Sequence, residues 1–396
     1  MGAPLTRRHD EKSIAGDMLA LGLMSGTSMD GIDAAVLRAD GVGRWDVLGH
    51  FHRAHDEDMR ALLRQAMRDA RTLTDRVARP GVLAEAEEAV TRAHADFVND
   101  IMAMSDWPLE LIGFHGQTVL HAPDRGLTVQ LGDGRELADL TGVPVLWDMR
   151  ANDVAHGGQG APLAPAWHLA LAGRLPMRPV MFVNIGGVSN ITWIGADADM
   201  PHAFDTGPGN ALMDDLVRAK TGEPFDRDGA LAGRGEVNED LLHVLLANPA
   251  LMRPPPRSFD RNDFRMAAEL VESLPLTDAL ATLCRFTARC IADAAHWLPG
   301  PPELWVIAGG GRHNRALMRM LAEEVDAPVV PAEAVEMDGD HMEAECWAWL
   351  AVRALKGLPI SWPTTTGVPR PLSGGVLSRP GERPATVPED GEGDEK

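Results

Sequence analysis

The chain has 396 residues, 45% of them hydrophobic, so it can bury a sizeable core and is long enough for two lobes. Its 37 Lys and Arg against 58 Asp and Glu give a formal net charge of -21, which argues against nucleic acid as a partner, because neutralising phosphates takes clustered basic side chains. No apolar run approaches the roughly 20 residues of a membrane helix and the N-terminus is polar, so no membrane partner is expected.

The chain contains three cysteines, Cys284, Cys290 and Cys346. They lack the C-x-x-C spacing of a metal or redox motif, and no pair of histidines accompanies them. Neither a cysteine-held zinc ion nor a disulfide framework is therefore expected, and the ligands of any metal are left unassigned. This cysteine usage predicts a protein of the reducing cytoplasm.

Both ends of the chain are polar, and the C-terminal end is rich in Pro, Gly and acidic residues. Residues 1–16 and 379–396 are therefore predicted to be disordered. The folded body opens with apolar residues at 18–38, interrupted by a Gly-rich loop at 25–31. This pattern predicts a strand, a turn and a second strand.

The middle of the chain predicts a long helix followed by short strands. Apolar residues recur at three- and four-residue steps from Leu83 to Ile101, which is the mark of an amphipathic helix with one face on a core. Short apolar runs then predict strands at 111–113, 128–131 and 143–146.

The strand, Gly-rich turn and strand pattern recurs at 180–194, about 160 residues after the first. A helix is then predicted after Pro275, with Thr277 as its cap, and a strand at 304–308. The helix is expected to bury Leu280, Leu283, Cys284 and Ile291. Alternating strands and helices give an α/β class, and the repeated unit is what two similar lobes facing one cleft would produce, although Gly-rich turns are common in α/β proteins.

The first loop, Gly26 to Asp33, contains two glycines, two hydroxyls and two carboxylates. Glycines let backbone N–H groups approach a ligand, and hydroxyls donate hydrogen bonds to phosphate oxygens. Asp30 and Asp33 are of the type that holds Mg²⁺ or orients an acceptor. The alternative is a tight hairpin turn whose Asp-Gly pair only sets its geometry.

Two further Gly-rich segments precede predicted helices. Phe204 to Asn210 leads into a helix and offers an anion site, with Asp205 aimed into the cleft; alternatively Asn210 is simply the helix cap. Gly309 to Gly311 follows a strand and leaves room for a flat ligand such as an adenine with its ribose, although a tight turn explains it as well.

Two polar clusters follow predicted strands, and both suit a sugar with hydroxyl, acetamido and carboxylate groups. The alternative for the first is a structural histidine at position 115. The clusters comprise His115, Gln117 and Thr118, and Arg150, Asn152 and Asp153.

In order and wording, five of these strings resemble the anhydro-N-acetylmuramic acid kinases. They are Gly-Leu-Met-Ser-Gly-Thr-Ser-Met-Asp-Gly at 22–31, Gly-Phe-His-Gly-Gln-Thr at 113–118, Asn-Ile-Gly-Gly-Val-Ser-Asn at 184–190, Phe-Asp-Thr-Gly-Pro-Gly-Asn at 204–210, and Gly309 to Gly311 with Asn314. The resemblance implies a two-lobed actin-like ATPase fold, ribonuclease H-like in each lobe, with ATP in a central cleft and a homodimeric assembly.

The family's reaction converts 1,6-anhydro-N-acetylmuramic acid, water and ATP into N-acetylmuramic acid 6-phosphate and ADP, as part of cell-wall recycling. By resemblance, Asp205 is the general base that takes a proton from the attacking water. Substrate contacts are expected from the two polar clusters above and from Glu345, which alternatively lies on a solvated helix face. ATP and Mg²⁺ are expected at Ser25, Gly26, Thr27, Ser28, Asp30, Gly31, Asp33, Gly186, Gly187, Gly207, Gly209, Asn210, Gly309, Gly310, Gly311 and Asn314.

The resemblance also places lobe I at 17–151 plus 364–378 and lobe II at 152–363. One segment departs from the family, because 256–264 reads Pro-Arg-Ser-Phe-Asp-Arg-Asn-Asp-Phe where a Pro-Lys-Ser-Thr-Gly-Arg-Glu-like string is usual. A kinase for a different amino sugar and a non-catalytic nucleotide-binding regulator of the same fold are therefore the alternatives.

Overall fold

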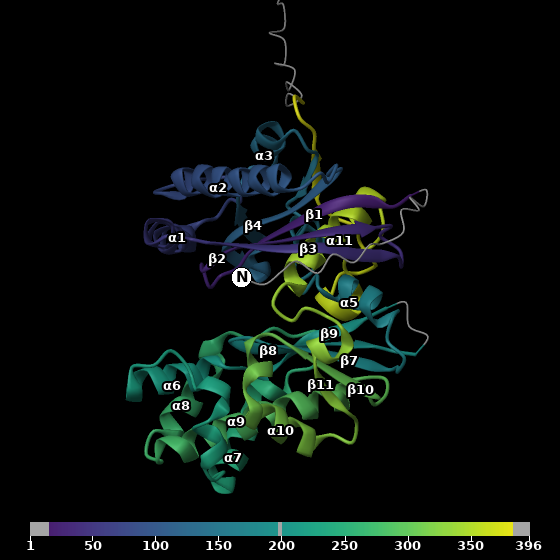
Figure 1. Cartoon of the computed structure of the whole chain (residues 1–396). Helices are drawn as coiled ribbons and strands as arrows, with labels where there is room; N and C mark the ends of the chain where they lie inside the picture. The colour runs from purple at the N-terminus through teal and green to yellow at the C-terminus, as the bar shows by residue number, and fades with distance from the viewer. Residues whose placement is uncertain (1–15, 197–199, 383–396) are drawn as a thin grey trace, which may run out of the picture.

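The computed structural model describes residues 16–196 and 200–382 (Figure 1). The ends predicted to be disordered, 1–16 and 379–396, lie almost entirely outside the described residues. Within the described ranges, none of the helices combines the length and the apolarity that crossing a bilayer requires.

The first lobe is built on a mixed sheet in which β1 is central. Its strands run in the order β12-β6-β4-β1-β2-β3, and β5 pairs with β4 in addition. β1 is antiparallel to β2 and parallel to β4, which is parallel to β6. The strands are β1 (Met18–Ser25), β2 (Gly31–Ala39), β3 (Trp45–Ala54), β4 (Leu111–Ala122), β5 (Leu127–Leu131), β6 (Val145–Trp147) and β12 (Val376–Ser378).

The second lobe repeats this plan in the order β11-β10-β7-β8-β9. Here β7 is antiparallel to β8 and parallel to β10, and β8 is antiparallel to β9. Two sheets with the same order and the same directions confirm the expected two-lobed actin-like ATPase fold. The strands are β7 (Val180–Ile185), β8 (Val188–Ile194), β9 (His202–Pro208), β10 (Leu304–Ala308) and β11 (Val329–Pro331).

The helices form three layers around the two sheets (Figure 1). The outer face of the first sheet carries α1 (Glu57–Asp69), α2 (Leu83–Met104) and α3 (Gly134–Thr141). Between the sheets lie α5 (Pro165–Ala172) and α11 (Met342–Leu355), which join both into one apolar core. The outer face of the second sheet carries α6 (Ala211–Thr221), α7 (Glu239–Leu246), α8 (Arg265–Val271), α9 (Leu276–Asp293) and α10 (Arg315–Glu324). The short helices α4 (Ala151–Ala155) and α12 (Pro363–Thr366) complete the set in the described chain.

Helix α11 packs directly on the first sheet. A Cβ at Gly22 would lie 2.0 Å from the Ala344 carbonyl oxygen, and one at Gly113 would lie 2.1 Å from that of Trp347. Only glycine permits this approach of helix to sheet. The range predicted for lobe II, 152–363, thus includes a helix that packs on the first sheet, because the chain returns there before β12 pairs with β6. The exact lobe boundaries stay a prediction.

Three local predictions are wrong. The segment 204–210 is mostly strand rather than loop, since β9 extends through Pro208 by pairing with β8. The cluster from His115 to Thr118 lies within β4 and does not follow it. Helix α9 begins at Leu276, with Pro275 at the cap position, and the Thr277 hydroxyl bonds to Asp278 Oδ1 at 3.3 Å instead of capping the helix. The buried face predicted for this helix is confirmed.

Candidate active site

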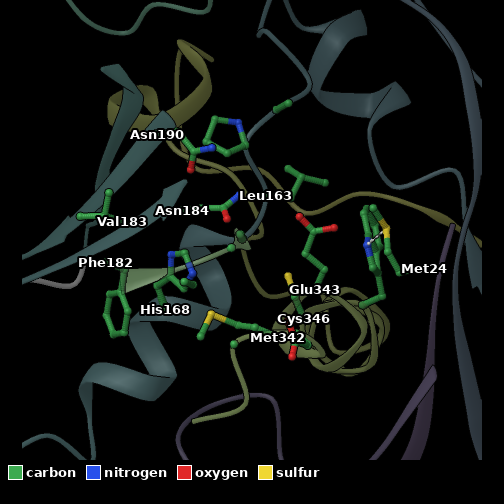
Figure 2. A pocket seen from close by; sticks show the side chains of 18 of the residues that line it. Met24, Leu163, His168, Phe182, Val183, Asn184, Asn190, Met342, Glu343 and Cys346 are labelled. Atoms are coloured by element: carbon green, nitrogen blue, oxygen red, sulfur yellow. Dashed lines mark hydrogen bonds between the residues drawn. The ribbon is translucent and has the colours of Figure 1, made fainter. Parts of the chain in front are cut away.

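A cavity of about 400 Å³ lies between the two lobes. One wall comes from β7, β8 and β10 of the second sheet, and the other from the end of β1, from Arg150 and from α11. Figure 2 shows Asn184 and Asn190 reaching toward the cavity from the second sheet and Glu343 reaching into it from α11. Polar groups from both lobes therefore converge on one space, as expected of a ligand site.

The polar wall on the second sheet follows from strand register. Asn184 of β7 pairs with Asn190 of β8, which pairs with Asp205 of β9. Residues directly opposite each other on paired strands point to the same face, with Cβ atoms about 4.5–5.5 Å apart. Asp205 thus lies beside Asn190 on the sheet face that borders the cavity, although it is not itself among the lining residues.

The Asp205 side chain is held by the segment that follows α7. Its Oδ2 accepts a hydrogen bond from the Phe259 backbone N–H at 2.8 Å, and its own carbonyl oxygen accepts one from Arg257 Nε at 3.0 Å. Burial raises the pKa of the Asp205 carboxyl group to about 6, and the Phe259 N–H and the Arg257 charge only partly oppose this. A carboxylate with a raised pKa is a stronger base than an exposed one.

The opposite wall carries a charge pair. Arg150 lies over the Trp347 ring at 5.1 Å, with its guanidinium 3.2 Å from Nε2 of the buried His115. Burial, reinforced by Arg150, lowers the pKa of His115, so the imidazole is neutral and accepts this contact. Glu343 lines the same cavity, and desolvation raises the pKa of its carboxyl group, while the charge of Arg150 opposes the shift. This wall therefore presents the Arg150 cation together with the Glu343 carboxyl group, whose pKa is raised.

Comparison with known proteins assigns these features to a family. The model of the family "Anhydro-N-acetylmuramic acid kinase" matches residues 18–379. The chain belongs to this family. The anhydro-N-acetylmuramic acid kinase of Nitrobacter winogradskyi is 50% identical over 370 residues, and that of Rhodopseudomonas palustris 49% over 370 residues; each match covers 92% of this chain and 100% of the relative. The resemblance seen in the sequence is thereby confirmed.

Among solved structures, the activator of the 2-hydroxyisocaproyl-CoA dehydratase from Clostridium difficile with bound ADPNP is similar with a TM-score of 0.44 and 11% identity, covering 86% of this chain and 96% of that chain. A ROK family glucokinase from Streptomyces griseus, in complex with glucose and AMPPNP, has a TM-score of 0.39 and 16% identity, covering 84% and 99%.

The loop at 26–30, in the family's first string, follows directly after β1. Thr27, Ser28 and Asp30 are exposed, and the Ser28 hydroxyl donates to Asp30 Oδ1 at 2.7 Å. Ser25 is buried and donates to Gln117 Oε1 at 2.6 Å, and the Gln117 amide in turn donates to the Gly26 carbonyl at 3.1 Å. Gln117 thus holds this loop in shape, and its predicted contact with substrate stays a prediction.

At the far end of the loop, Gly31 begins β2 and Asp33 follows within it. The Asp33 carboxylate lies 2.7 Å from His52 Nδ1. Met24, just before the loop, lines the cavity, and Trp347 Nε1 of α11 lies 3.1 Å from its sulfur. The family's loop thus meets α11 at one end of the cavity.

Of the glycines predicted to contact nucleotide, Gly309 and Gly310 line the cavity. Gly309 has φ +72°, and a Cβ there would lie 2.3 Å from Asn184 Oδ1, so glycine is required. Space beside Gly310 is open, since a Cβ there would meet nothing closer than Asn210 Nδ2 at 3.6 Å. Gly311 is packed against Ile185.

Gly186 and Gly187 form the turn between β7 and β8, and their carbonyls accept hydrogen bonds from the Asn210 and Gly209 backbone N–H groups at 2.7 and 3.0 Å. The Asn210 side chain donates to the Ile185 carbonyl at 3.1 Å rather than capping α6. A Cβ at Gly207 would lie 2.8 Å from that of Cys290. These residues pack inside the second lobe and are not among those that line the cavity, so their predicted contact with nucleotide stays a prediction.

Several predicted substrate residues are engaged inside the protein. Asp153 is buried and accepts from the Gly160 N–H and the Thr366 hydroxyl, each at 2.6 Å, and Asn152 donates to the Ser373 carbonyl at 2.7 Å. Thr118 accepts from Gln130 Nε2 at 3.1 Å. These contacts give the side chains structural partners and leave their predicted contact with substrate untested.

Two further predicted residues have partners that are not among the residues lining the cavity. Asn314 caps α10, accepting the Leu317 N–H at 3.0 Å. Glu345 is 3% exposed, so the solvated-face alternative for it is wrong: it faces His50, 2.8 Å from Nε2, instead of solvent.

Sequence reasoning did not assign a site role to Asn184, Asn190, His168 or Glu343, all of which line the cavity. The two asparagines are the first and last residues of the family-like string 184–190, and this position could have identified them as candidate site residues. Glu343 differs from Glu345 by two positions on α11, and helical periodicity alone gave no reason to prefer it. His168 sits beside the second sheet, 2.8 Å from the Thr192 hydroxyl, with no sequence motif around it.

Proposed function

We propose that this chain is an ATP-dependent kinase that opens 1,6-anhydro-N-acetylmuramic acid with water and phosphorylates it to N-acetylmuramic acid 6-phosphate, for peptidoglycan recycling and amino-sugar catabolism. Membership of the family and relatives of that name at about half identity over their full length support the substrate and the reaction. The observation that carries the mechanism is Asp205, a carboxylate with a raised pKa at the end of the Asn184 and Asn190 row.

In the proposed reaction, Asp205 takes a proton from a water molecule as the water oxygen bonds to the anomeric carbon. The bond from that carbon to O6 breaks, and O6 attacks the γ-phosphorus of ATP. The bond to the β-γ bridging oxygen then breaks and ADP leaves, while Asp205 returns its proton to solvent. A base with a pKa near the working pH contributes roughly 10²- to 10⁴-fold in rate.

The nucleotide is proposed to lie between the Gly26 to Asp33 loop and the glycines at 309–311. The exposed hydroxyls of Thr27 and Ser28 face the phosphates in this arrangement, and the open space beside Gly310 takes the adenosine. Hydrogen-bond donors fixed at a position where charge develops stabilise the transition state without reorganisation.

Mg²⁺ is the expected partner of ATP in this reaction. Asp30 and Asp33 supply carboxylate oxygens, the ligand type Mg²⁺ prefers, and one oxygen of each carries the Ser28 or His52 contact while the other remains for the ion or its waters. When bound, Mg²⁺ neutralises charge on the transferring phosphoryl group. Arg150, fixed beside His115, is proposed to pair with the carboxylate of the muramic acid.

We also infer a homodimer in the cytoplasm. The homodimer rests on the family resemblance alone. The cytoplasmic location is supported by the cysteines, because Cys284, Cys290 and Cys346 are all buried and unpaired, as expected of a reducing compartment.

A different amino sugar as substrate is the second candidate, and one contact favours keeping it. The segment 256–264 departs from the family's usual string, and within it the Phe259 N–H binds the Asp205 carboxylate. A changed segment next to the proposed base Asp205 could select a different sugar as the phosphoryl acceptor.

The test is ADP release by purified protein with Mg-ATP, with and without 1,6-anhydro-N-acetylmuramic acid, with mass spectrometry of the sugar. A ring-opened, phosphorylated product is expected. Asp205→Asn should lower the sugar-dependent rate by about 10²- to 10⁴-fold while nucleotide binding persists.

Asp214→Asn is the matched control, because burial also raises the pKa of Asp214 to about 6 while this residue lies on α6, on the outer face of the second sheet. Its rate should match the unmodified chain. If ADP release does not depend on this sugar but does on another amino sugar, the second candidate holds; if it depends on no sugar, the kinase proposal fails.

A further inference from the structure

A cluster of histidine and carboxylate side chains lies outside the cavity, where the chain crosses from the second lobe to the first. Asp338 and His341 belong to the segment 336–341 that leads into α11, and His50 belongs to β3 of the first sheet. We propose that His50, Asp338 and His341 form a binding site for one divalent transition-metal ion, with zinc as the ion that fits their chemistry.

The spacing of the three ligand atoms suits a metal. Asp338 Oδ2 lies 3.4 Å from His50 Nδ1 and 3.1 Å from His341 Nδ1, and all three ligand atoms lie within 4.8 Å of one another. In a tetrahedral site with zinc bonds of about 2.0–2.2 Å, neighbouring ligand atoms are about 3.3–3.6 Å apart. Rotation of the His341 ring, with small shifts of the other two side chains, therefore brings the three atoms to bonding distance of a common ion.

The surroundings of His50 hold it in the orientation that a metal needs. While its Nδ1 faces Asp338, its Nε2 lies 2.8 Å from Oε1 of the buried Glu345. The other Glu345 oxygen accepts from Trp167 Nε1 at 3.3 Å. Metal-binding histidines usually give their second ring N–H to a carboxylate, which fixes both tautomer and ring direction. This arrangement also gives a purpose to Glu345, a carboxylate that burial alone would disfavour.

His341 completes the set. Its ring stacks on that of His50, with centroids 4.6 Å apart and planes 11° from parallel. Because an imidazole binds a metal in its ring plane, the His341 ring must turn out of this stack to face the same ion as His50. Its Nδ1 is buried and, although 3.1 Å from Asp338 Oδ2, lacks the alignment of a hydrogen bond. A buried ring nitrogen in this state is costly unless it gains a partner. A metal ion at the centre of the three ligand atoms supplies one.

The donor set selects the ion. Two imidazole nitrogens with one carboxylate suit zinc and similar transition metals, whereas Mg²⁺ prefers oxygen ligands throughout. The side chains of His50, Asp338 and His341 are 23%, 35% and 24% exposed, so an ion can enter and water can fill a fourth position. The alternative is that a protonated His50 simply bridges Asp338 and Glu345 with no metal at all.

The position of the site gives it a structural role. Asp340, in the same segment, is held from the second lobe by Arg312 Nη2 at 2.8 Å, and Gly339 and Asp340 line the cavity. A metal that ties Asp338 and His341 to β3 therefore fixes the lobe connection, and with it one edge of the cavity. This inference goes beyond the proposed kinase reaction and does not depend on it.

The test is isothermal titration of the full chain, stripped of metal with a chelator, with zinc chloride. The expected result is one zinc ion per chain. His341→Ala and Asp338→Asn should each weaken binding at least about 100-fold. Glu345→Gln should keep the stoichiometry and weaken binding by about 10- to 100-fold, as loss of the carboxylate behind a ligating histidine does.

His243→Ala is the matched control, since this histidine is exposed on α7 in the second lobe, and it should bind zinc as the unmodified chain does. Circular dichroism checks that each variant is folded, and Asp338→Asn, in an accessible segment, carries the test if His341→Ala does not fold. Absence of zinc binding, binding unchanged by both ligand variants, or equal binding of magnesium would overturn the proposal.

Discussion

The two lobes share one strand plan, yet their first hairpin turns differ in what surrounds them. The turn between β1 and β2 is open to solvent and carries Thr27, Ser28 and Asp30. The turn between β7 and β8 consists of Gly186 and Gly187, whose carbonyls are taken by backbone N–H groups at the start of α6. The first turn offers polar side chains to a ligand, whereas the second has no side chains and its carbonyls are hydrogen-bonded within the lobe.

The difference teaches that a duplicated topology does not duplicate chemistry. In the second lobe the proposed base lies two strands along, at Asp205 on β9, where pairing with Asn190 puts it on the sheet face that borders the cavity. The role of a turn or strand therefore depends on the side chains it carries and on what packs against it. Each of the following predictions tests one side of this contrast.

The largest effect on stability is expected at Gly209, which packs against the turn between β7 and β8. A Cβ at Gly209 would lie 2.2 Å from the Gly186 carbonyl oxygen, a backbone atom that cannot move aside alone. Gly209→Ala should lower the free energy of unfolding by about 3 kcal/mol, which is roughly 150-fold in the folding equilibrium. Urea unfolding followed by tryptophan fluorescence measures the loss.

Gly26→Ala in the open turn is the matched change, because its Cβ would meet only the Ser28 hydroxyl at 3.4 Å. Its stability should change by no more than about 0.5 kcal/mol. Equal losses in the two variants would show that both turns are packed alike and would remove the contrast.

The next effect concerns the exposed turn. If Asp30 helps to hold Mg²⁺, Asp30→Asn should lower sugar-dependent turnover by roughly 10- to 100-fold with little change in stability, as loss of a group that supports a metal does. Raised Mg²⁺ should recover part of the rate. Steady-state ADP release at several Mg²⁺ concentrations measures this.

Asp96→Asn, an exposed carboxylate on α2, controls for the general loss of one negative charge. It should leave turnover unchanged. A normal rate in Asp30→Asn at every Mg²⁺ concentration would show that the open turn has no part in holding the ion.

The smallest effect is the pH response of Asp205. Its pKa is raised to about 6 in the folded chain, and the base must be ionised, so kcat/KM should fall about fivefold between pH 6 and pH 5. For stability the sign is opposite: the folded state favours the protonated carboxyl, so the ionised form costs stability, increasingly from pH 4 up to about 6. Asp205→Asn should therefore raise the free energy of unfolding at pH 7.5, by roughly 1–3 kcal/mol.

A pH profile of kcat/KM and urea unfolding of both proteins at pH 7.5 check the two halves. Activity that stays flat down to pH 5, or an Asp205→Asn variant less stable than the unmodified chain, would contradict the burial of this carboxylate.

Local sequence patterns were sufficient to predict the helices and strands whose apolar residues recur with a regular period. The apolar steps from Leu83 to Ile101 predicted α2, and the run at 304–308 predicted β10 with the same bounds, because helix and strand periodicities are properties of neighbouring residues. Patterns failed at 204–208, where glycines and a proline read as loop. There, pairing with β8 outweighs the local preference, and no local pattern shows the partner.

The sequence by itself determined the α/β class, the repeated hairpin unit and, through five strings, the family. Only the tertiary structure decided which of those residues meet. The environment of Asp205 depends on Phe259, 54 positions away, and the partners of Glu345 are His50 and Trp167, 295 and 178 positions away. Burial, a raised pKa and a convergent set of metal ligands are properties of contacts between distant segments, and such contacts exist only once the chain has folded.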